Sequence, residues 1–185
     1  KNRWAKDYLT IISKKETPFN FTMLTVDTHH IDGYVCDLCE DEHELQYANV
    51  ISCASRQLDE FINWIKMQAF YENTSIVIVG DHPTMDKEFV KDVDDTYLRT
   101  TYNVFINPAG NLNDVRLKNR DFYSFDFFPT TLSSLNVNIK GDRLGLGTNL
   151  FSDEPTLYEK YGIEMENEIR KKSKFYENTF LYPKE

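Results

Sequence analysis

The sequence predicts an α/β fold, a mostly parallel sheet flanked by helices, with its chemistry at the ends of strands. Two short apolar segments, residues 19–26 and 75–80, have the composition of buried strands, and a long helical pattern separates them. Each segment runs into a polar loop that contains aspartate and histidine. Since ligands bind beyond the carboxyl ends of the strands in such sheets, these two loops are the first candidates for a functional site.

The N-terminal part of the chain alternates between helical and extended patterns. Apolar side chains recur at helical spacing over residues 3–14 and 47–68, which predicts two amphipathic helices. Residues 19–26 are rich in Phe, Thr, Leu and Val and predict a strand. The almost wholly apolar run 75–80 predicts a central strand that is covered on both faces.

The C-terminal part continues this alternation. Residues 102–106 predict a third strand, and residues 125–135 predict a helix that admits Pro129 near its first turn. A glycine-rich loop is expected at 141–147 and a charged terminal helix at 156–176. The length of 185 residues allows one or two domains, and no internal repeat divides the chain.

Composition excludes several classes of protein. An apolar share of 41% with 14% aromatic residues is typical of a globular chain, and a net charge of -9 without a basic stripe argues against nucleic-acid binding. No run approaches the roughly 18 apolar residues of a membrane-spanning helix. The chain opens on an apolar helical pattern without an initiating methionine, so we expect a fragment, and any membrane anchor would lie upstream.

The loop after the second strand begins with Gly80, Asp81 and His82. A carboxylate next to an imidazole at the end of a buried strand can direct both groups at one divalent cation, such as Mn²⁺, Zn²⁺ or Mg²⁺. The alternative is a structural turn in which Asp81 caps the segment that follows. Two ligands do not complete a site, so the pattern alone leaves both interpretations open.

The loop after the first strand carries His29 and His30. A histidine at the tip of a strand can donate a hydrogen bond to a phosphoryl oxygen and stabilise the charge that develops on it. The alternative is a pair of half-exposed loop histidines without a chemical role. Asp27 and Asp32, on either side, would then fix the histidine tautomers or simply serve the turn.

The three cysteines lie between these two loops. Cys36, Cys39, His43 and Cys53 have the spacing C-x₂-C-x₃-H-x₉-C, which a zinc ion can bind. A disulfide is the alternative in an oxidising compartment, and three free thiols are the alternative in the cytosol.

Several segments of the chain resemble the phosphoglycerol transferase I family of the alkaline-phosphatase/sulfatase superfamily, to which the lipoteichoic acid synthases are related. The resemblance rests on FNFTMLTVDTHHIDGY at 19–34, NTSIVIVGDHPTM at 73–85 and RLGLG at 143–147, and it spans most of residues 15–152. The Gly-Asp-His sequence is shared by the wider superfamily. The Thr-Val-Asp-Thr-His-His and Arg-Leu-Gly-Leu-Gly sequences occur in a much smaller group of proteins and are therefore more specific.

The resemblance implies roles for individual residues. Asp81 and His82 match the family's metal-ligand pair, for Mn²⁺ or Zn²⁺. His29 matches the histidine that contacts the phosphoglycerol group, and His30 is a weaker second candidate. The family's threonine nucleophile and remaining metal ligands, including a glutamate, belong to the N-terminal half, which we expect to precede Lys1.

The resemblance also implies a fold and a covalent link. Residues 1–185 would be the C-terminal half of an alkaline-phosphatase/sulfatase-like catalytic domain. Its strands at 19–27 and 75–80 would be neighbours, so that His29 lies close to Asp81 and His82. Cysteines of the family match Cys39 and Cys53, which implies a disulfide between them and leaves Cys36 free.

The reaction implied is double displacement. A metal-activated threonine takes phosphoglycerol from phosphatidylglycerol and passes it to an extracytoplasmic glycan or glycerol-phosphate acceptor. The protein would act in the periplasm or on the outer face of the membrane, held by an upstream anchor. Without its N-terminal half the chain is expected to be inactive and to bind metal weakly or not at all.

Two alternatives remain open at this stage. A sulfatase or a phosphoethanolamine transferase of the same superfamily would share the Gly-Asp-His loop. A non-catalytic module that binds glycans or lipid headgroups would use exposed aromatic rings, for which the candidates are Tyr97, Tyr102, Phe122 and Tyr123. Rings at such spacings are also typical of a hydrophobic core.

Overall fold

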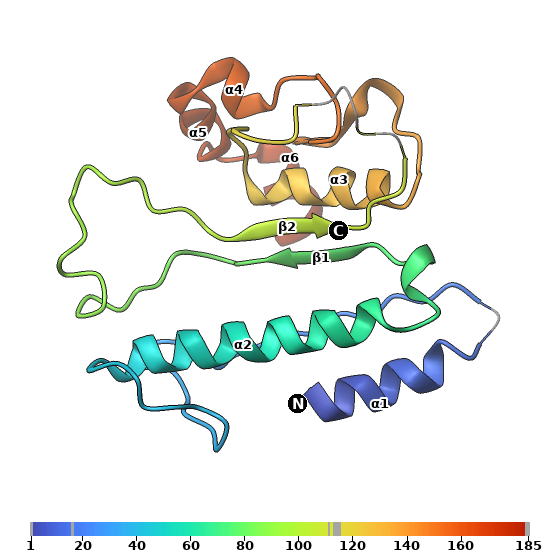
Figure 1. Ribbon diagram of the computed structural model, residues 1–185. Helices are drawn as coiled ribbons and strands as arrows, with labels where there is room; N and C mark the ends of the chain where they lie inside the picture. The colour runs from blue at the N-terminus through green and yellow to red at the C-terminus, as the bar shows by residue number, and fades with distance from the viewer. Residues whose placement is uncertain (1, 16, 111, 113–115, 184–185) are drawn as a thin grey trace. The chain divides into compact units, whose positions relative to one another are not determined.

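The computed structural model describes residues 2–15, 17–110, 112 and 116–183 (Figure 1). The chain divides into two compact units. The first unit comprises Lys1–Thr74 with Ile78–Val104, and the second comprises Ser75–Val77 with Phe105–Glu185. No helix within the described ranges is long and apolar enough to cross a membrane.

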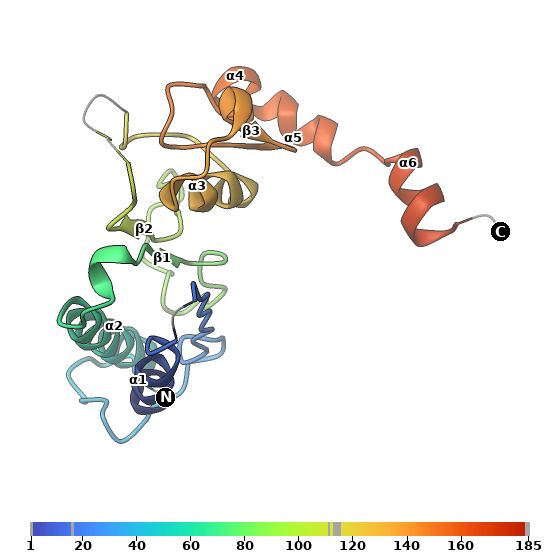
Figure 2. The same ribbon diagram turned by 90° about the vertical axis from the view of Figure 1, so that its right-hand side faces the viewer.

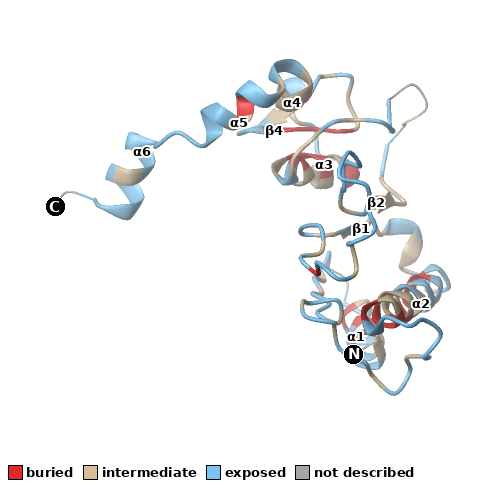
Figure 3. Cartoon of the chain, turned by 90° about the vertical axis from the view of Figure 1, so that its left-hand side faces the viewer, coloured by how far each residue is buried: buried red, intermediate tan, exposed pale blue. Residues whose placement is uncertain are grey.

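Two helices form the core of the first unit. They are α1, Asn2–Ile12, and α2, Gln46–Lys66, and both were predicted from apolar periodicity. Each buries one face and exposes the other, as the colouring of Figure 3 shows. The buried apolar residues of the pair are Ala5, Leu9, Ile12, Tyr47, Val50, Cys53, Phe61, Ile62 and Ile65.

Helix α1 lies alongside α2 (Figures 1 and 2). The side chain of Asn2 donates a hydrogen bond of 2.8 Å to the carbonyl of Gln57. The ammonium of Lys6 lies 5.7 Å from the centre of the Trp64 ring, a cation–π contact. These polar contacts fix the relative positions of two helices whose buried faces pack together.

Two of the three predicted strands form, and they are less covered than predicted. A short helical turn, η1 (Tyr71–Asn73), precedes β1 (Ile76–Val79), which pairs with β2 (Asn103–Ile106) in a two-stranded sheet. Figure 1 shows the two strands running in opposite directions. Both strands were predicted, but no residue of either is fully buried. The prediction that residues 75–80 are covered on both faces is therefore wrong, because Val79 is exposed and the other residues of β1 are only half-buried.

The predicted strand at 19–26 does not form. The segment is extended but pairs with no other strand, and most of it is exposed, including Leu24 at 81% and Val26 at 60%. Residues with a high β-propensity fit a pleated surface. A strand also needs a neighbouring strand to form hydrogen bonds with its backbone groups. The described residues contain no parallel sheet, and residues 19–27 and 75–80 are not neighbouring strands.

The second unit opens with helical segments and a hairpin. The turn η2 (Ser124–Asp126) leads into α3 (Phe127–Ser134), which confirms the helix predicted with Pro129 near its start. After η3 (Lys140–Asp142), the glycine-rich loop forms a tight antiparallel hairpin. Its strands are β3, Arg143–Leu144, and β4, Gly147–Thr148.

Gly147 explains why this hairpin needs glycine. A Cβ at this position would clash with the carbonyl oxygen of Phe125 and would lie 2.9 Å from the ring of Pro129. The strand β4 is buried at both residues, so glycine allows the backbone of the hairpin to pack directly against the start of α3.

The C-terminal segment is several short helices instead of the one predicted at 156–176. They are α4 (Leu157–Tyr161), α5 (Ile163–Ile169), α6 (Lys174–Tyr176) and η4 (Glu177–Leu181). The first break falls at Gly162, whose φ of 57° is outside the range of a right-handed helix.

A buried carboxylate and a buried ion pair organise the second unit, and the carboxylate is that of Asp126. Asp126 is fully buried and accepts the backbone N–H of Thr148 at 2.6 Å and that of Tyr123 at 2.8 Å. Burial raises the pKa of Asp126, and these two hydrogen bonds oppose that shift. Asp126 therefore links the start of α3 to the hairpin.

The buried ion pair is between Arg120 and Glu159. The guanidinium donates from Nε and from Nη2 to the two carboxylate oxygens, each at 2.9 Å, and the side chains are only 5% and 12% exposed. Burial works to raise the pKa of Glu159, but the hydrogen bonds from Arg120 and from the N–H of Thr156 outweigh it and lower that pKa. The pair ties the start of α4 to the segment before η2.

Candidate functional site

The loop that carries the predicted substrate histidines is a closed turn at residues 27–33 of the first unit. The N–H of Tyr34 donates to the carbonyl of Asp27 at 2.7 Å, which closes the loop. Gly33 has a φ of 67°, and a Cβ there would lie 2.6 Å from the Asp27 carbonyl and 2.7 Å from the side chain of Val50. Glycine at this position thus lets the loop pack against α2. His29 lies within the loop, with Nδ1 2.6 Å from the carbonyl of His30.

The first turn of α2 anchors this loop. The hydroxyl of Tyr47 donates to the carbonyl of Thr28 at 2.7 Å, and the side-chain amide of Gln46 donates to the carbonyl of Asp32 at 3.2 Å. Tyr47 is buried, so its hydrogen bond to Thr28 is shielded from water. The position of the histidine loop is therefore set by α2 and not by a strand.

Asp81 and His82 follow β1 and face solvent: the histidine side chain is 57% exposed and that of the aspartate 81%. Oδ2 of Asp81 lies 3.6 Å from Nε2 of His82, and Oδ1 accepts the backbone N–H of His82 at 2.9 Å. Nδ1 of His82 lies 2.9 Å from the carbonyl of Pro83. A carbonyl partner on Nδ1 leaves Nε2 free to bind a cation, an arrangement typical of metal-binding histidines. The pair therefore fits two ligands of one metal ion.

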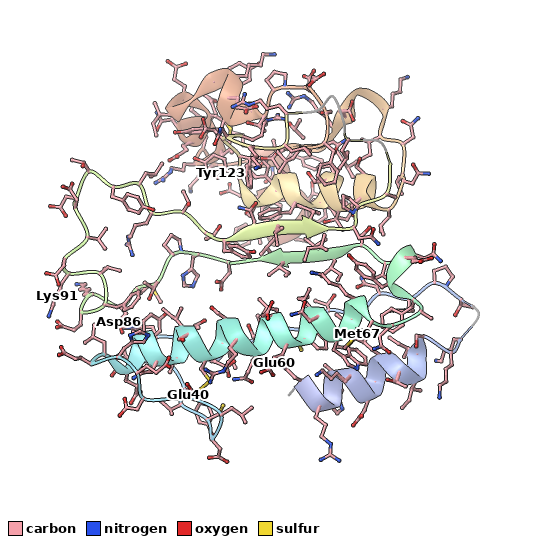
Figure 4. All side chains as sticks on the ribbon, in the orientation of Figure 1. Glu40, Glu60, Met67, Asp86, Lys91 and Tyr123 are labelled. Carbon is pink, nitrogen blue, oxygen red and sulfur yellow. A yellow bond between two sulfur atoms is a disulfide. The ribbon has the colours of Figure 1, made fainter. Side chains whose placement is uncertain are left out.

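Asp86 joins the two loops, and sequence reasoning missed it. Its side chain is 3% exposed and accepts the N–H of Phe89 at 3.0 Å. That hydrogen bond lowers the pKa of Asp86 against the effect of burial, and so do the backbone N–H of Asp32 and the charge of His30. Figure 4 shows Asp86 beside the N-terminal end of α2. The histidine loop and the segment after Asp81 thus meet at one buried carboxylate.

Tyr47 makes a second link between the same segments. Its hydroxyl holds Thr28, as described above, and its ring packs edge-on against Phe89 with 5.1 Å between centroids. Phe89 lies in a segment without helical or strand periodicity, so only the structure reveals its contact with Tyr47.

Two buried polar atoms at this junction have no hydrogen-bond partner among the described residues. They are Nδ1 of His30 and Oδ2 of Asp86. Buried polar groups are nearly always satisfied by protein, water or an ion.

Asp81 and His82 are the two metal ligands that the sequence predicts in this chain, and no third candidate ligand among the described residues lies with them. In the described part of the chain, the three cysteines form the only group of three or more potential ligands. Asp81 and His82 lie together as a pair, but neither His29 nor His30 joins them in such a group. Two ligands suit a metal site that other residues complete.

The cysteines form a disulfide and a free thiol. Cys39 and Cys53 are bonded, with 5.1 Å between their Cα atoms, and Cys36 is free. This is the pairing that the family resemblance implies. The zinc motif with His43 does not form, because the cluster of sulfur atoms does not include His43.

The aromatic residues considered for a binding module are divided between the surface and ring packing. Tyr97 and Tyr102 are exposed, whereas the ring of Tyr123 stacks on Phe125 at 5.5 Å and Phe122 packs against a ring of α3. Tyr97 lines an open depression of about 270 Å³ together with charged side chains. Ligand sites are usually enclosed and apolar, so this depression does not favour the binding-module hypothesis.

The disulfide is expected to stabilise the first unit by about 3 kcal/mol, the loop-entropy value for a closed loop of this size. Reduction, or Cys39→Ser, should lower the urea midpoint of unfolding measured by far-UV circular dichroism. Cys36→Ser is the matched control and should leave the midpoint unchanged, because Cys36 is not bonded. Equal midpoints for the oxidised and reduced chains would contradict this prediction.

Comparison with known proteins finds relatives named phosphoglycerol transferase I. The chain is 36% identical over 81 residues to phosphoglycerol transferase I of Citrobacter koseri, and 35% identical over 81 residues to that of Escherichia fergusonii. Each match covers 40% of this chain and 11% of the relative. For phosphoglycerol transferase I of Salmonella paratyphi B, the identity is 35% over 89 residues, 45% of this chain and 11% of the relative.

No protein-family model and no solved structure matches the chain. The matched segment spans about a tenth of the length of the curated relatives. Within that segment, the chain is similar to phosphoglycerol transferase I, as the sequence motifs indicate.

Proposed function

We propose that this chain is the C-terminal part of the catalytic domain of an extracytoplasmic phosphoglycerol transferase. The observation that carries the proposal is the junction at Asp86 and Tyr47, which holds the His29 loop and the Asp81–His82 segment together. The similarity to phosphoglycerol transferase I supports the same class of reaction. The Cys39–Cys53 disulfide supports an oxidising, extracytoplasmic location.

Asp81 and His82 would hold a divalent cation, Mn²⁺ or Zn²⁺, together with ligands from the rest of the protein. Bound there, the ion would polarise the phosphoryl group and activate a hydroxyl nucleophile. The carbonyl of Pro83 would keep Nε2 of His82 directed at the ion.

His29 would contact the phosphoglycerol group. The carbonyl of His30 accepts from Nδ1 when that nitrogen carries the proton, which fixes the ring. Protonation of Nε2 as well would let it donate a hydrogen bond to a phosphoryl oxygen. His30 lies at the buried junction with Asp86, so its part would be to position the loop.

The donor would be phosphatidylglycerol, and the acceptor a glycan or glycerol-phosphate polymer of the cell envelope. The threonine nucleophile and a membrane anchor would come from the remainder of the protein. The net charge of -9 fits neither nucleic acid nor an unassisted attachment to anionic lipid.

The test is an assay of the full-length protein with phosphatidylglycerol labelled in its glycerol headgroup. We expect transfer of label to a glycan acceptor, loss of transfer after metal removal by a chelator, and recovery with Mn²⁺ or Zn²⁺. Release of sulfate from an aryl sulfate, or transfer of phosphoethanolamine without transfer of phosphoglycerol, would replace the proposal with another activity of the superfamily. Full transfer in the presence of the chelator would show that the proposed reaction does not depend on a metal ion.

A further inference from the structure

The three cysteine sulfur atoms form a compact cluster that the proposed reaction does not use. Cys36 and Cys39 lie on one turn, closed by the N–H of Cys39 donating to the carbonyl of Cys36 at 2.9 Å. Their sulfur atoms are 3.6 Å apart. Cys53 enters from α2, where it is buried, and all three sulfurs lie within 4.8 Å of one another.

This spacing fits a metal with thiolate ligands. Zinc binds cysteine sulfur at about 2.3 Å with tetrahedral geometry, which places neighbouring sulfurs about 3.8 Å apart. The separation of 3.6 Å between Cys36 and Cys39 is close to that value. A C-x₂-C turn with a further cysteine is also a frequent framework of structural zinc sites.

N–H donors already surround the sulfurs. The side-chain amide of Gln57 is 3.3 Å from the sulfur of Cys53 and 3.6 Å from that of Cys36. The backbone N–H of Cys36 donates to the sulfur of Cys39 at 3.4 Å. Such N–H···S contacts stabilise thiolates, and they are the outer-shell partners that a thiolate-bound metal requires.

The loop is held in place by contacts other than the disulfide. Arg56 donates to the carbonyl of Leu38 at 2.6 Å. The side-chain amide oxygen of Asn49, a buried residue, accepts the N–H of Glu42 at 2.9 Å and that of His43 at 2.7 Å. Because these bonds do not depend on the disulfide, we expect Cys36 and Cys39 to stay beside Cys53 in the reduced chain.

The charge around the cluster favours a cation. The loop between Cys39 and α2 is rich in carboxylates, and Glu40 lies near the N-terminal half of α2 in Figure 4. One arginine, Arg56, lies 3.5 Å from Glu40, so the local charge remains negative. A negative surface raises the local concentration of divalent cations.

We propose that the reduced form of this cluster binds one Zn²⁺ through the thiolates of Cys36, Cys39 and Cys53, with water as the fourth ligand. A dithiol or phosphine reductant supplies two electrons and is itself oxidised, and the sulfur–sulfur bond becomes two thiols. Zinc binding then displaces three protons, one from each cysteine. Zinc and the disulfide exclude one another, so the site exists in one redox state only.

The test is metal titration of the chain reduced with a phosphine, first with Co²⁺ and then with Zn²⁺. We expect one equivalent of Co²⁺ to give thiolate charge-transfer bands and tetrahedral d–d bands, and Zn²⁺ to remove both. Cys36→Ser should weaken zinc binding by more than about 100-fold, the upper end for loss of an outer-shell partner. Gln57→Leu should weaken it by about 10-fold. The oxidised chain should not bind.

His43→Ala is the matched control and should bind zinc as the wild type does, because His43 is outside the cluster. Loss of binding in His43→Ala, or unchanged binding in Cys36→Ser, would overturn the assignment of the three ligands. A reduced wild-type chain that does not bind zinc would overturn the proposal, whether or not the chain keeps its helical circular dichroism signal, since the loop contacts do not depend on the disulfide.

Discussion

Asp81→Ala in the full-length protein is expected to lower the rate of phosphoglycerol transfer by about a thousandfold or more. A metal ion contributes several kcal/mol to stabilising phosphoryl charge, and each 1.4 kcal/mol is about a factor of ten in rate. Asp81 and His82 are the two ligands that the family resemblance implies in this chain, and they lie together, with 3.6 Å between Oδ2 and Nε2. Removing either one leaves the metal with a single ligand from this segment.

The measurement separates a loss of metal from a loss of fold. Asp81 is 81% exposed, so Asp81→Ala should keep the urea midpoint of the wild type. Metal content after gel filtration should fall with activity, and excess Mn²⁺ should restore part of the rate. Asp92→Ala, an exposed aspartate of the same segment, is the control and should retain full activity. A near-normal rate in Asp81→Ala would exclude Asp81 from the site.

The helices of the first unit could be predicted because a single stripe of apolar residues determines them. The face of α1 that carries Ala5, Leu9 and Ile12 is buried, and α1 packs against α2. The conformation of residues 19–26 could not be predicted in this way. Its composition suits a strand, but strand formation depends on a partner, and composition says nothing about whether a partner is present.

The second group of incorrect predictions concerns where helices and strands begin and end. Gly162 interrupts an otherwise helical charge pattern, and its positive φ ends α4 after only five residues. The glycine-rich segment before Phe151 is predicted as a loop, whereas in the structure Gly147 and Thr148 pair with β3, and Gly147 allows this strand to pack against the start of α3. In both places the sequence contains the glycine, but the presence of a glycine does not specify its backbone conformation.

The candidate site was predicted in part. Strand-end loops drew attention to His29 and to the Asp81–His82 pair, whose side chains lie 3.6 Å apart in the structure. Asp86 carries no motif, because a buried carboxylate that accepts backbone N–H groups is identified by its contacts and not by its neighbours in sequence. The same is true of Asp126.

Asp126→Ala is expected to destabilise the second unit by about 4 kcal/mol. The carboxylate accepts two backbone N–H groups, those of Thr148 and Tyr123. Each buried donor left without a partner costs about 1–3 kcal/mol. Asp126 and Thr148 are both 0% exposed, so water cannot replace the lost acceptor without opening the hairpin.

Asp126→Asn gives a graded test of the same argument. The amide keeps the shape of the carboxylate but offers one acceptor and one donor group, so one of the two N–H groups would face an NH₂ group. We expect a loss of about 2 kcal/mol, roughly half of that for alanine. Asp153→Ala, an exposed aspartate of the same unit, should change stability by less than about 0.5 kcal/mol.

The measurement must report on the second unit alone. Both tryptophans, Trp4 and Trp64, belong to the first unit, so tryptophan fluorescence does not serve. Hydrogen exchange of peptides that cover α3 and β4 does, because the Thr148 amide is protected directly by Asp126. Exchange in Asp126→Ala should quicken across both elements by the factor that corresponds to the lost free energy. Wild-type protection at Thr148 in that variant would show that the carboxylate does not hold the hairpin to α3.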